Sequence, residues 1–277
     1  MTRILTIIFL LIIGFSLTAQ DRQYYKRIGI DSLYLDIYHP EMEKDGAKPV
    51  VVFFFGGGWK KWNFDKFVPH AKYFAKRGLV SIVVDYRTFN RDGISPAACL
   101  RDAKSSIRYL RTHADKLGID PDRIIAAGGS AGGHLAAACA VVEGFNEPSD
   151  DLSISERPNA LVLFNPVIDN GPGGYGYDRV KEYYLGFSPL HNLHYDTPPT
   201  LFMVGTEDKY IPVETARYYQ KVMQKMGLRC DLKLYEGQKH GFFNHHHFDM
   251  YNKTLLDMDE FLQSLGYLKK NPVVTIE

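Results

Sequence analysis

The chain has 277 residues, of which 45% are apolar and 23% charged, and its 33 basic and 32 acidic residues leave a formal net charge of +1. This is the composition of an ordinary globular protein, and no basic cluster predicts a nucleic-acid partner. The three cysteines are too widely spaced for a zinc site or a disulfide framework, so we expect buried, unpaired thiols at Cys99, Cys139 and Cys230.

Residues 1–20 have the pattern of a secretory signal peptide. Arg3 is followed by a mostly apolar run over residues 4–17, and small residues stand at positions 18 and 19. The run is short for a membrane span, so we predict cleavage near Ala19 or Gln20, with an uncleaved anchor as the alternative. We expect the mature protein, residues 21–277, to be secreted or periplasmic and to have no stable association with a membrane.

Buried strands and helices alternate along the rest of the chain. The predicted strands are residues 33–40, 48–55, 79–86, 123–128, 160–167, 199–205 and 230–236. The predicted helices are residues 64–76, 96–116, 132–142, 213–226 and 248–265. This alternation predicts an α/β fold in a single domain, with a mainly parallel central sheet and helices on both faces. A long, aromatic and glycine-rich connection over about residues 170–196 predicts a lid-like insertion.

A single serine is crowded by glycines where a buried strand meets an alanine-rich helix. The sequence GGSAG over residues 128–132 fits the G-x-S-x-G pattern of a tight strand-to-helix turn. Such a turn raises Oγ of Ser130 above the sheet at a helix N-terminus, where free N–H groups favour developing negative charge. A hydroxyl alone is a poor nucleophile, so Ser130 needs a base and a group that orients this base.

A histidine that follows the last predicted strand is the expected base. Carboxyl ends of parallel strands share one edge of a sheet, so His240 should lie close to Ser130. The glycine after it, Gly241, lets the backbone turn near the site. Residues 245–247 are three consecutive histidines at the start of the last helix. We assign them to the surface, because no carboxylates are spaced to complete a metal site with them.

An aspartate after the preceding strand is the expected orienting acid. Asp208 stands in the loop GTEDKYIP and is preferred to its neighbour Glu207. Asp169, which follows the strand before that, is the alternative. The chain order Ser130, Asp208, His240 is the order Ser…Asp…His found in one class of serine hydrolases.

Four motifs resemble those of the α/β-hydrolase esterases with an HGGGW-type glycine loop, including secreted carbohydrate-esterase and feruloyl-esterase-like members. They are FGGGW at residues 55–59, GGSAGG at 128–133, GTEDKYIP at 205–212 and KHGFF at 239–243. The resemblance covers about residues 33–265. It implies an oxyanion hole made by the backbone N–H groups of Gly57, Gly58 and Ala131. Phe55 replaces the usual histidine of the loop, so the loop must be supported by other residues.

Aromatic residues near the glycine loop are candidates for contact with the substrate. Trp59 and Trp62 flank the loop, and Tyr175 stands in the lid-like insertion. Trp59 is expected to cap the acyl side of the pocket, although aromatic residues near a cleft are often part of the core. Two further residues are interpreted structurally, Asp102 as a partner of nearby arginines and His134 as a polar packing residue.

These features predict a serine carboxylesterase that is exported and hydrolyses short-chain esters, above all acetyl esters on carbohydrate. A feruloyl esterase and a formamidase-type amidase are alternatives, and a catalytically silent binding module is the non-enzymatic one. No cofactor and no metal are expected. The expected partner is a small-molecule or polysaccharide ester. The oligomeric state, the acyl group and the alcohol stay open.

Overall fold

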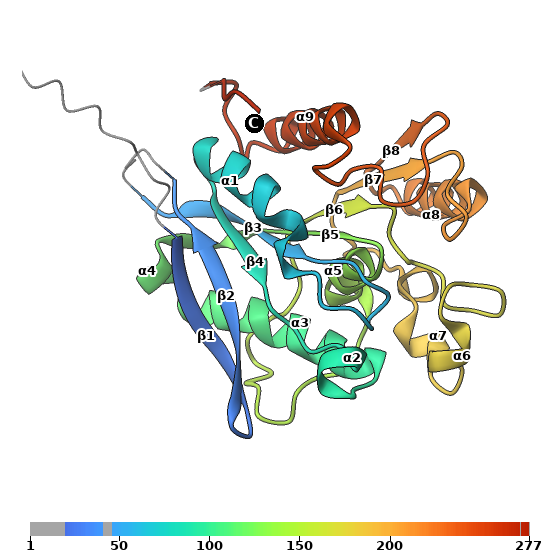
Figure 1. Cartoon of the computed structure of the whole chain (residues 1–277), viewed down its shortest axis with the longest axis horizontal. Coiled ribbons are helices and arrows are strands. Elements are labelled where there is room, and N and C mark those ends of the chain that lie inside the picture. The colour runs from blue at the N-terminus through green and yellow to red at the C-terminus, as the bar shows by residue number, and fades with distance from the viewer. Residues whose placement is uncertain (1–19, 41–45, 272, 277) are drawn as a thin grey trace, which may run out of the picture.

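One eight-stranded sheet runs through the part of the chain that the structure describes, residues 20–40, 46–271 and 273–276 of a computed structural model (Figure 1). Its strands are β1 (Gln20–Ile28), β2 (Asp31–Tyr38), β3 (Lys48–Phe54), β4 (Val80–Val84), β5 (Ile119–Gly129), β6 (Ala160–Phe164), β7 (Thr200–Gly205) and β8 (Cys230–Tyr235). Their order across the sheet is β1-β2-β4-β3-β5-β6-β7-β8. The signal peptide predicted for residues 1–20 lies outside the described residues except for its last one.

Strands β3 to β8 are parallel, and only the β1–β2 and β2–β4 pairs are antiparallel. The helices are η1 (Phe64–Phe67), α1 (Val68–Lys76), α2 (Phe89–Asp92), α3 (Pro96–Thr112), α4 (Ala114–Leu117), α5 (Ala131–Val141), α6 (Tyr177–Val180), α7 (Tyr184–Phe187), η2 (Pro189–Asn192), α8 (Val213–Lys225) and α9 (Phe248–Ser264). Figure 1 shows α1 and α9 on one side of the sheet and α3 and α5 on the other. The predicted α/β class, with a mainly parallel sheet and helices on both faces, is confirmed.

The core is centred on β3, β5 and the helix that follows β5. Residues 50–54 of β3 are fully buried, and every residue of α5 is buried as well. Alanine and glycine make up most of α5, so its backbone can pack closely against β3, β5, β6 and α3. The helix that begins one residue after Ser130 is therefore rigidly held by its surroundings.

Predicted and observed elements differ mainly at the edges. Each of the seven predicted strands and five predicted helices is present within a few residues of its predicted bounds, except that the strand predicted at 123–128 begins at Ile119 and the helix predicted at 96–116 is interrupted at His113. Strand β1 was not predicted, because its sequence QDRQYYKRI has no apolar run. It exists by antiparallel pairing with β2.

A buried ion-pair network fastens β1 to α3. The carboxylate of Asp102 is fully buried and lies 2.7 Å from Nζ of Lys26 and 2.7 Å from Nη2 of Arg87. Removing one partner of a buried pair would leave an uncompensated charge, which costs several kcal/mol, on the order of 3–5. The structural interpretation of Asp102 is confirmed.

The structure also shows the state of the cysteines, the character of the helices and the grouping of side chains that could bind a metal. Cys99, Cys139 and Cys230 are buried and unpaired, as expected. Within the described ranges, no helix is both long and apolar enough to cross a membrane. In the same ranges, no three histidine, cysteine, aspartate or glutamate side chains gather as metal ligands would.

Candidate active site

Ser130 stands at a sharp turn between β5 and α5. Its backbone has φ 55° and ψ −120°, a conformation that costs a non-glycine residue of order 1–3 kcal/mol and is characteristic of functional sites. The flanking glycines allow the strand and helix to approach each other. A Cβ atom on Gly128 would overlap the backbone at Gly132, and one on Gly132 would overlap the carbonyl oxygens of Phe54 and Phe55. The predicted turn therefore requires glycine at both positions.

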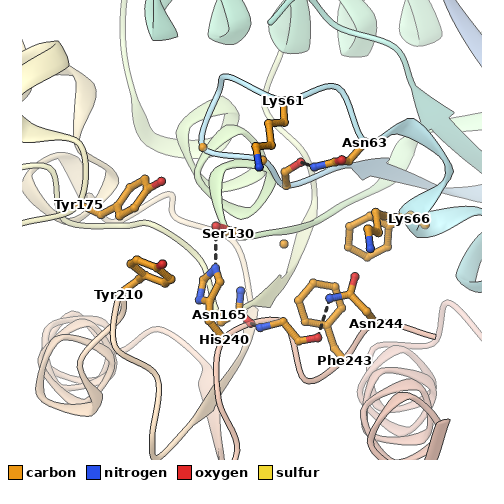
Figure 2. Close-up of a pocket in the computed structure, with 16 residues that line it drawn as sticks. Lys61, Asn63, Lys66, Ser130, Asn165, Tyr175, Tyr210, His240, Phe243 and Asn244 are labelled. Atoms are coloured by element: carbon orange, nitrogen blue, oxygen red, sulfur yellow. Dashed lines mark hydrogen bonds between the residues drawn. The ribbon is translucent and has the colours of Figure 1, made fainter. Parts of the chain in front are cut away.

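The structure brings Ser130, His240 and Asp208 together by two hydrogen bonds, of which Figure 2 shows the one between Ser130 and His240. Nε2 of His240 lies 2.9 Å from Oγ of Ser130, and Nδ1 of His240 lies 2.7 Å from Oδ2 of Asp208. Because the carboxylate can only accept a hydrogen bond, Nδ1 carries the proton and Nε2 offers its lone pair to the serine hydroxyl. This is the arrangement in which a histidine acts as the base toward a serine.

Asp208 is held by hydrogen bonds to both of its carboxylate oxygens. Its side chain is fully buried, while that of His240 is 22% exposed. The second carboxylate oxygen, Oδ1, accepts hydrogen bonds from the backbone N–H groups of Tyr210 at 2.8 Å and Ile211 at 3.0 Å. Asp169 makes no such contact: its Oδ1 accepts a hydrogen bond from the N–H of Gly171 at 2.8 Å, within its own loop. The structure thus places Asp208, and not the alternative, beside His240.

Asn165 is a site residue that the sequence analysis missed. It directly follows β6, is fully buried and has a φ of 36°. Its Oδ1 accepts a hydrogen bond of 2.9 Å from the N–H of Gly241, the residue after His240. The signal in the sequence was an asparagine at the end of an apolar strand, on the same edge of the sheet as Ser130. Asn165 fixes the loop that carries His240.

The glycine loop after β3 lies beside Ser130. Gly57 and Gly58 have φ values of 140° and 63°, which favour glycine. A Cβ on Gly57 would lie 2.8 Å from Nδ2 of Asn63, and one on Gly58 would lie 2.6 Å from the hydroxyl of Tyr175. Ala131 is the first residue of α5, so its N–H has no partner within the helix. The predicted donors therefore belong to two backbone segments that meet at Ser130.

Side chains from several parts of the chain support this loop in place of the usual histidine. The ring of Phe55 stacks on that of Tyr86 with a centroid distance of 4.0 Å, and the Tyr86 hydroxyl donates to the Phe55 carbonyl at 2.6 Å. Nδ2 of Asn63 donates to the carbonyl of Gly56 at 3.0 Å. Nη1 of Arg179, in α6, donates to the carbonyl of Gly58. The carbonyl groups of Gly56 and Gly58 thus each accept a hydrogen bond from a side chain outside the glycine loop.

A pocket of about 380 Å³ opens over Ser130, within the size range of small-molecule sites (Figure 2). Tyr175 and Tyr210 lie on one side of Ser130, and Phe243 lies on the other. The lining residues are Gly56, Gly57, Gly58, Lys61, Asn63, Lys66, Phe67, Gly129, Ser130, Asn165, Tyr175, Tyr210, His240, Gly241, Phe243 and Asn244. The structure places Tyr175, one of the three predicted substrate-binding residues, in this lining.

The two tryptophans lie elsewhere, which corrects the expectation that they line the pocket. Trp59 is only 1% exposed and packs edge-on against His134, with ring centroids 5.1 Å apart. Trp62 is 41% exposed, stacks on Phe64 and donates from Nε1 to Asp85 at 2.9 Å. The indole of Trp59 is buried among aromatic rings, and Trp59 does not line the pocket over Ser130.

His134 has the packing role that its sequence position predicted. It is fully buried in α5, and its Nε2 lies 3.0 Å from the carbonyl of Phe187 in α7. Burial lowers its pKa to about 3, and the hydrogen bond to Phe187 opposes only part of this effect. His134 is therefore neutral at physiological pH and links α5 to the segment that supplies Tyr175.

Two family models match this chain, the BD-FAE family over residues 35–172 and the prolyl oligopeptidase family over residues 156–265. Among curated proteins, a probable isoprenylcysteine alpha-carbonyl methylesterase of Arabidopsis thaliana is 27% identical over 74% of this chain and 48% of its own length. The acetylxylan esterase of Xylanibacter ruminicola is 27% identical over 72% of this chain and 42% of its own length. The chain thus spans about half the length of these curated relatives.

Solved structures of esterase 2 from Thermogutta terrifontis match over nearly their whole length. The apo form is 40% identical, covers 91% of this chain and 97% of its own, and superposes with a TM-score of 0.87. Structures of the same esterase with propionate bound, with butyrate bound and phosphorylated by paraoxon have TM-scores of 0.85, 0.86 and 0.86. Both the identity and the coverage of this match are high. The chain belongs to the α/β-hydrolase esterases.

Proposed function

We propose that this protein is a serine carboxylesterase. The observation that carries the proposal is the hydrogen-bonded chain from Ser130 through His240 to Asp208, with distances of 2.9 Å and 2.7 Å. Its position below a pocket and beside the glycine loop adds the two other parts that ester hydrolysis needs, a place for the acyl group and donors for an oxyanion.

The reaction that fits this geometry has two halves. Oγ of Ser130 attacks the ester carbonyl while Nε2 of His240 takes its proton, and N–H groups of Gly57, Gly58 and Ala131 stabilise the oxyanion. The C–O bond to the alcohol then breaks, and His240 returns the proton to the leaving oxygen. Water attacks the acyl-enzyme with His240 as base, and the carboxylic acid and free Ser130 result. Asp208 holds the imidazole in the required tautomer throughout.

For the substrate, we propose short acyl groups, above all acetyl, on a carbohydrate alcohol. The support for a short acyl group is that the Thermogutta terrifontis esterase has structures with propionate and butyrate bound. The support for carbohydrate is that one relative is named an acetylxylan esterase. Residues 1–20 support export of the protein, so we propose a secreted or periplasmic location in which extracellular esters are accessible.

Labelling and turnover test the proposed function. Paraoxon should add a diethyl phosphate group to the peptide that contains Ser130, and Ser130→Ala should abolish this label and lower ester turnover at least 10³-fold. Ser153→Ala, at an exposed serine that does not line the pocket, is the matched control and should behave like the unmodified protein. Label on another residue, or undiminished turnover by Ser130→Ala, would contradict the proposal.

A panel of substrates separates the proposed esterase from its alternatives. Acetyl, butyryl, octanoyl and feruloyl esters, acetylated xylan and an aryl formamide should be compared by kcat/KM. We expect the acetyl esters to be preferred. Preference for feruloyl esters or for the formamide would replace the acetylesterase by one of these enzymes, and a labelled serine without turnover of any ester would favour the silent binding module.

A further inference from the structure

The lining of the pocket includes two lysines and no acid. Lys61 follows the glycine loop and Lys66 lies in η1, and Figure 2 shows Lys61 above Ser130 and Lys66 to one side, near Asn244. Among the described residues that line this pocket, none is an aspartate or a glutamate. The carboxylate of Asp208 is fully buried and is already engaged by His240.

Lys61 and Lys66 are exposed to solvent and differ from the buried lysines of the molecule, which are paired with acids. Nζ of Lys104 lies 3.1 Å from a Glu156 oxygen, and Nζ of Lys26 lies 2.7 Å from Asp102. Within the described ranges, Lys61 and Lys66 take part in no ion pair, although both carry a positive charge beside the reaction centre. Asp65, the neighbour of Lys66, does not line the pocket, but it lines an adjoining hollow that Lys66 lines as well.

The positive charges of Lys61 and Lys66 favour anionic ligands over cationic ones. Two like charges in the lining of one pocket raise the local concentration of anions and repel cations, although both lysines are exposed to solvent. The formal net charge of the whole chain is only +1, so the effect comes from the pocket and not from the protein's overall field. An ammonium group also forms charge-assisted hydrogen bonds with a carboxylate, which are stronger than those between neutral groups.

We propose that Lys61 and Lys66 form an anion subsite, and that the preferred ester carries a carboxylate. The inference rests on the proposed esterase function and names a class of substrate for it. On a carbohydrate, this chemistry is that of an acetylated uronic acid. The carboxylate can stand on the alcohol part or on the acyl part of the ester, and these two sources are distinguished by the probes below.

Two matched pairs of esters test the subsite. The pair 4-acetoxybenzoate and 4-acetoxybenzamide places the charge, or its neutral counterpart, on the alcohol. The pair 4-nitrophenyl hemisuccinate and 4-nitrophenyl 4-methylpentanoate places it on the acyl group. For at least one pair, Lys61→Met and Lys66→Met should each lower kcat/KM for the charged ester about threefold more than for its neutral partner, the size expected for an ion pair with an exposed side chain. Salt should weaken the preference of the unmodified protein for that charged ester, because ions screen the attraction.

A neighbouring lysine provides the control. Lys60 lines a different hollow, together with Trp59 and Phe89, so Lys60→Met should leave the charged-to-neutral ratio unchanged. If neither Lys61→Met nor Lys66→Met changes the ratio for either pair, while neutral esters are hydrolysed, the subsite is wrong and the esterase proposal stands. An effect of Lys60→Met equal to theirs would also overturn the subsite, since a general field would then explain the preference.

Binding measurements test the anion subsite without requiring ester turnover. In a Ser130→Ala background, calorimetry should show tighter binding of the charged ester than of its neutral partner, and Lys61→Met with Lys66→Met should remove the difference. If no ester is hydrolysed but this difference is found, the esterase proposal fails and the anion subsite holds. Equal binding of charged and neutral esters would overturn the subsite.

Discussion

Two regions meet at Ser130, and they are held in different ways. The strand ends that carry Ser130, Asp208 and His240 are fixed by the parallel sheet and by tight contacts of glycine with backbone. The glycine loop at residues 56–58 is fixed by side chains from distant segments, among them Arg179, 121 residues after the carbonyl it contacts. Backbone geometry therefore sets the position of the first region. The position of the second region depends on a few side-chain hydrogen bonds, which single substitutions can remove.

The sharpest test of the first region is its acid. Asp208→Asn should lower kcat about 10⁴-fold, because an amide can stabilise the wrong imidazole tautomer and cannot balance the imidazolium that forms during the reaction. Asp169→Asn is the matched control and should change kcat less than about threefold, since its carboxylate contacts Gly171 and not His240. Steady-state kinetics on an acetyl ester, with circular dichroism as the check on folding, measure both. The reverse ranking would assign the role to Asp169.

A second test breaks the backbone packing of the same region. Gly132→Ala should lower the free energy of unfolding by about 3 kcal/mol, because its Cβ would overlap the carbonyl oxygens of Phe54 and Phe55 and neither can move without the sheet. Urea denaturation followed by fluorescence measures the change. Gly186→Ala is the control, since no atom lies within 4 Å of a Cβ built there and φ is not positive. Equal losses in the two variants would contradict the packing argument.

The glycine loop should respond more mildly. Arg179→Met removes one donor to the Gly58 carbonyl, and Asn63→Ala removes one from Gly56. Deleting an oxyanion donor costs on the order of 10²–10³ in kcat, and displacing one costs less, so we expect about a tenfold fall in kcat with little change in KM for each variant. Lys181→Met, in the same segment but with an exposed side chain, is the control. A rise in KM with kcat unchanged would place Arg179 in substrate binding instead.

The same contrast explains how much the sequence could predict. The elbow at residues 128–132 and the loops of Asp208 and His240 follow from local patterns, because parallel strands bring their carboxyl ends together whatever the rest of the chain does. The supports of the glycine loop do not follow, since Tyr86, Asn63 and Arg179 come from three separate segments.

The tryptophans show the same limit. Trp59 stands next to the glycine loop in sequence, but its φ of 58° and the apolar space beside His134 and Phe187 set the direction of its ring. Adjacency in sequence predicts the neighbourhood of a side chain and not the face on which it lies. Strand β1 was missed for a related reason, because its partners β2 and Asp102 are not visible in its own composition.

The contact between the two regions gives the mildest prediction. His134 packs against Trp59 from the glycine loop and lies in the helix that begins after Ser130. Burial lowers the pKa of His134 to about 3, and burial lowers that of His70 to about 3 as well. Above about pH 6.5 these histidines are neutral in the folded and the unfolded chain. Below it, the unfolded chain binds protons that the folded chain does not, so stability should fall as pH decreases toward 3.

We expect each of these histidines to contribute about 1 kcal/mol of the stability lost between pH 7 and pH 5.5. His134→Gln keeps a donor for the Phe187 carbonyl and cannot be protonated, so it should remove about half of this histidine-dependent loss while His70 accounts for the other half. Urea midpoints measured at intervals from pH 7 to pH 5 provide the comparison. An unchanged pH dependence in His134→Gln would show that His134 is protonated equally in the two states. The pH dependence of stability would then not arise from His134, which packs between α5 and Trp59.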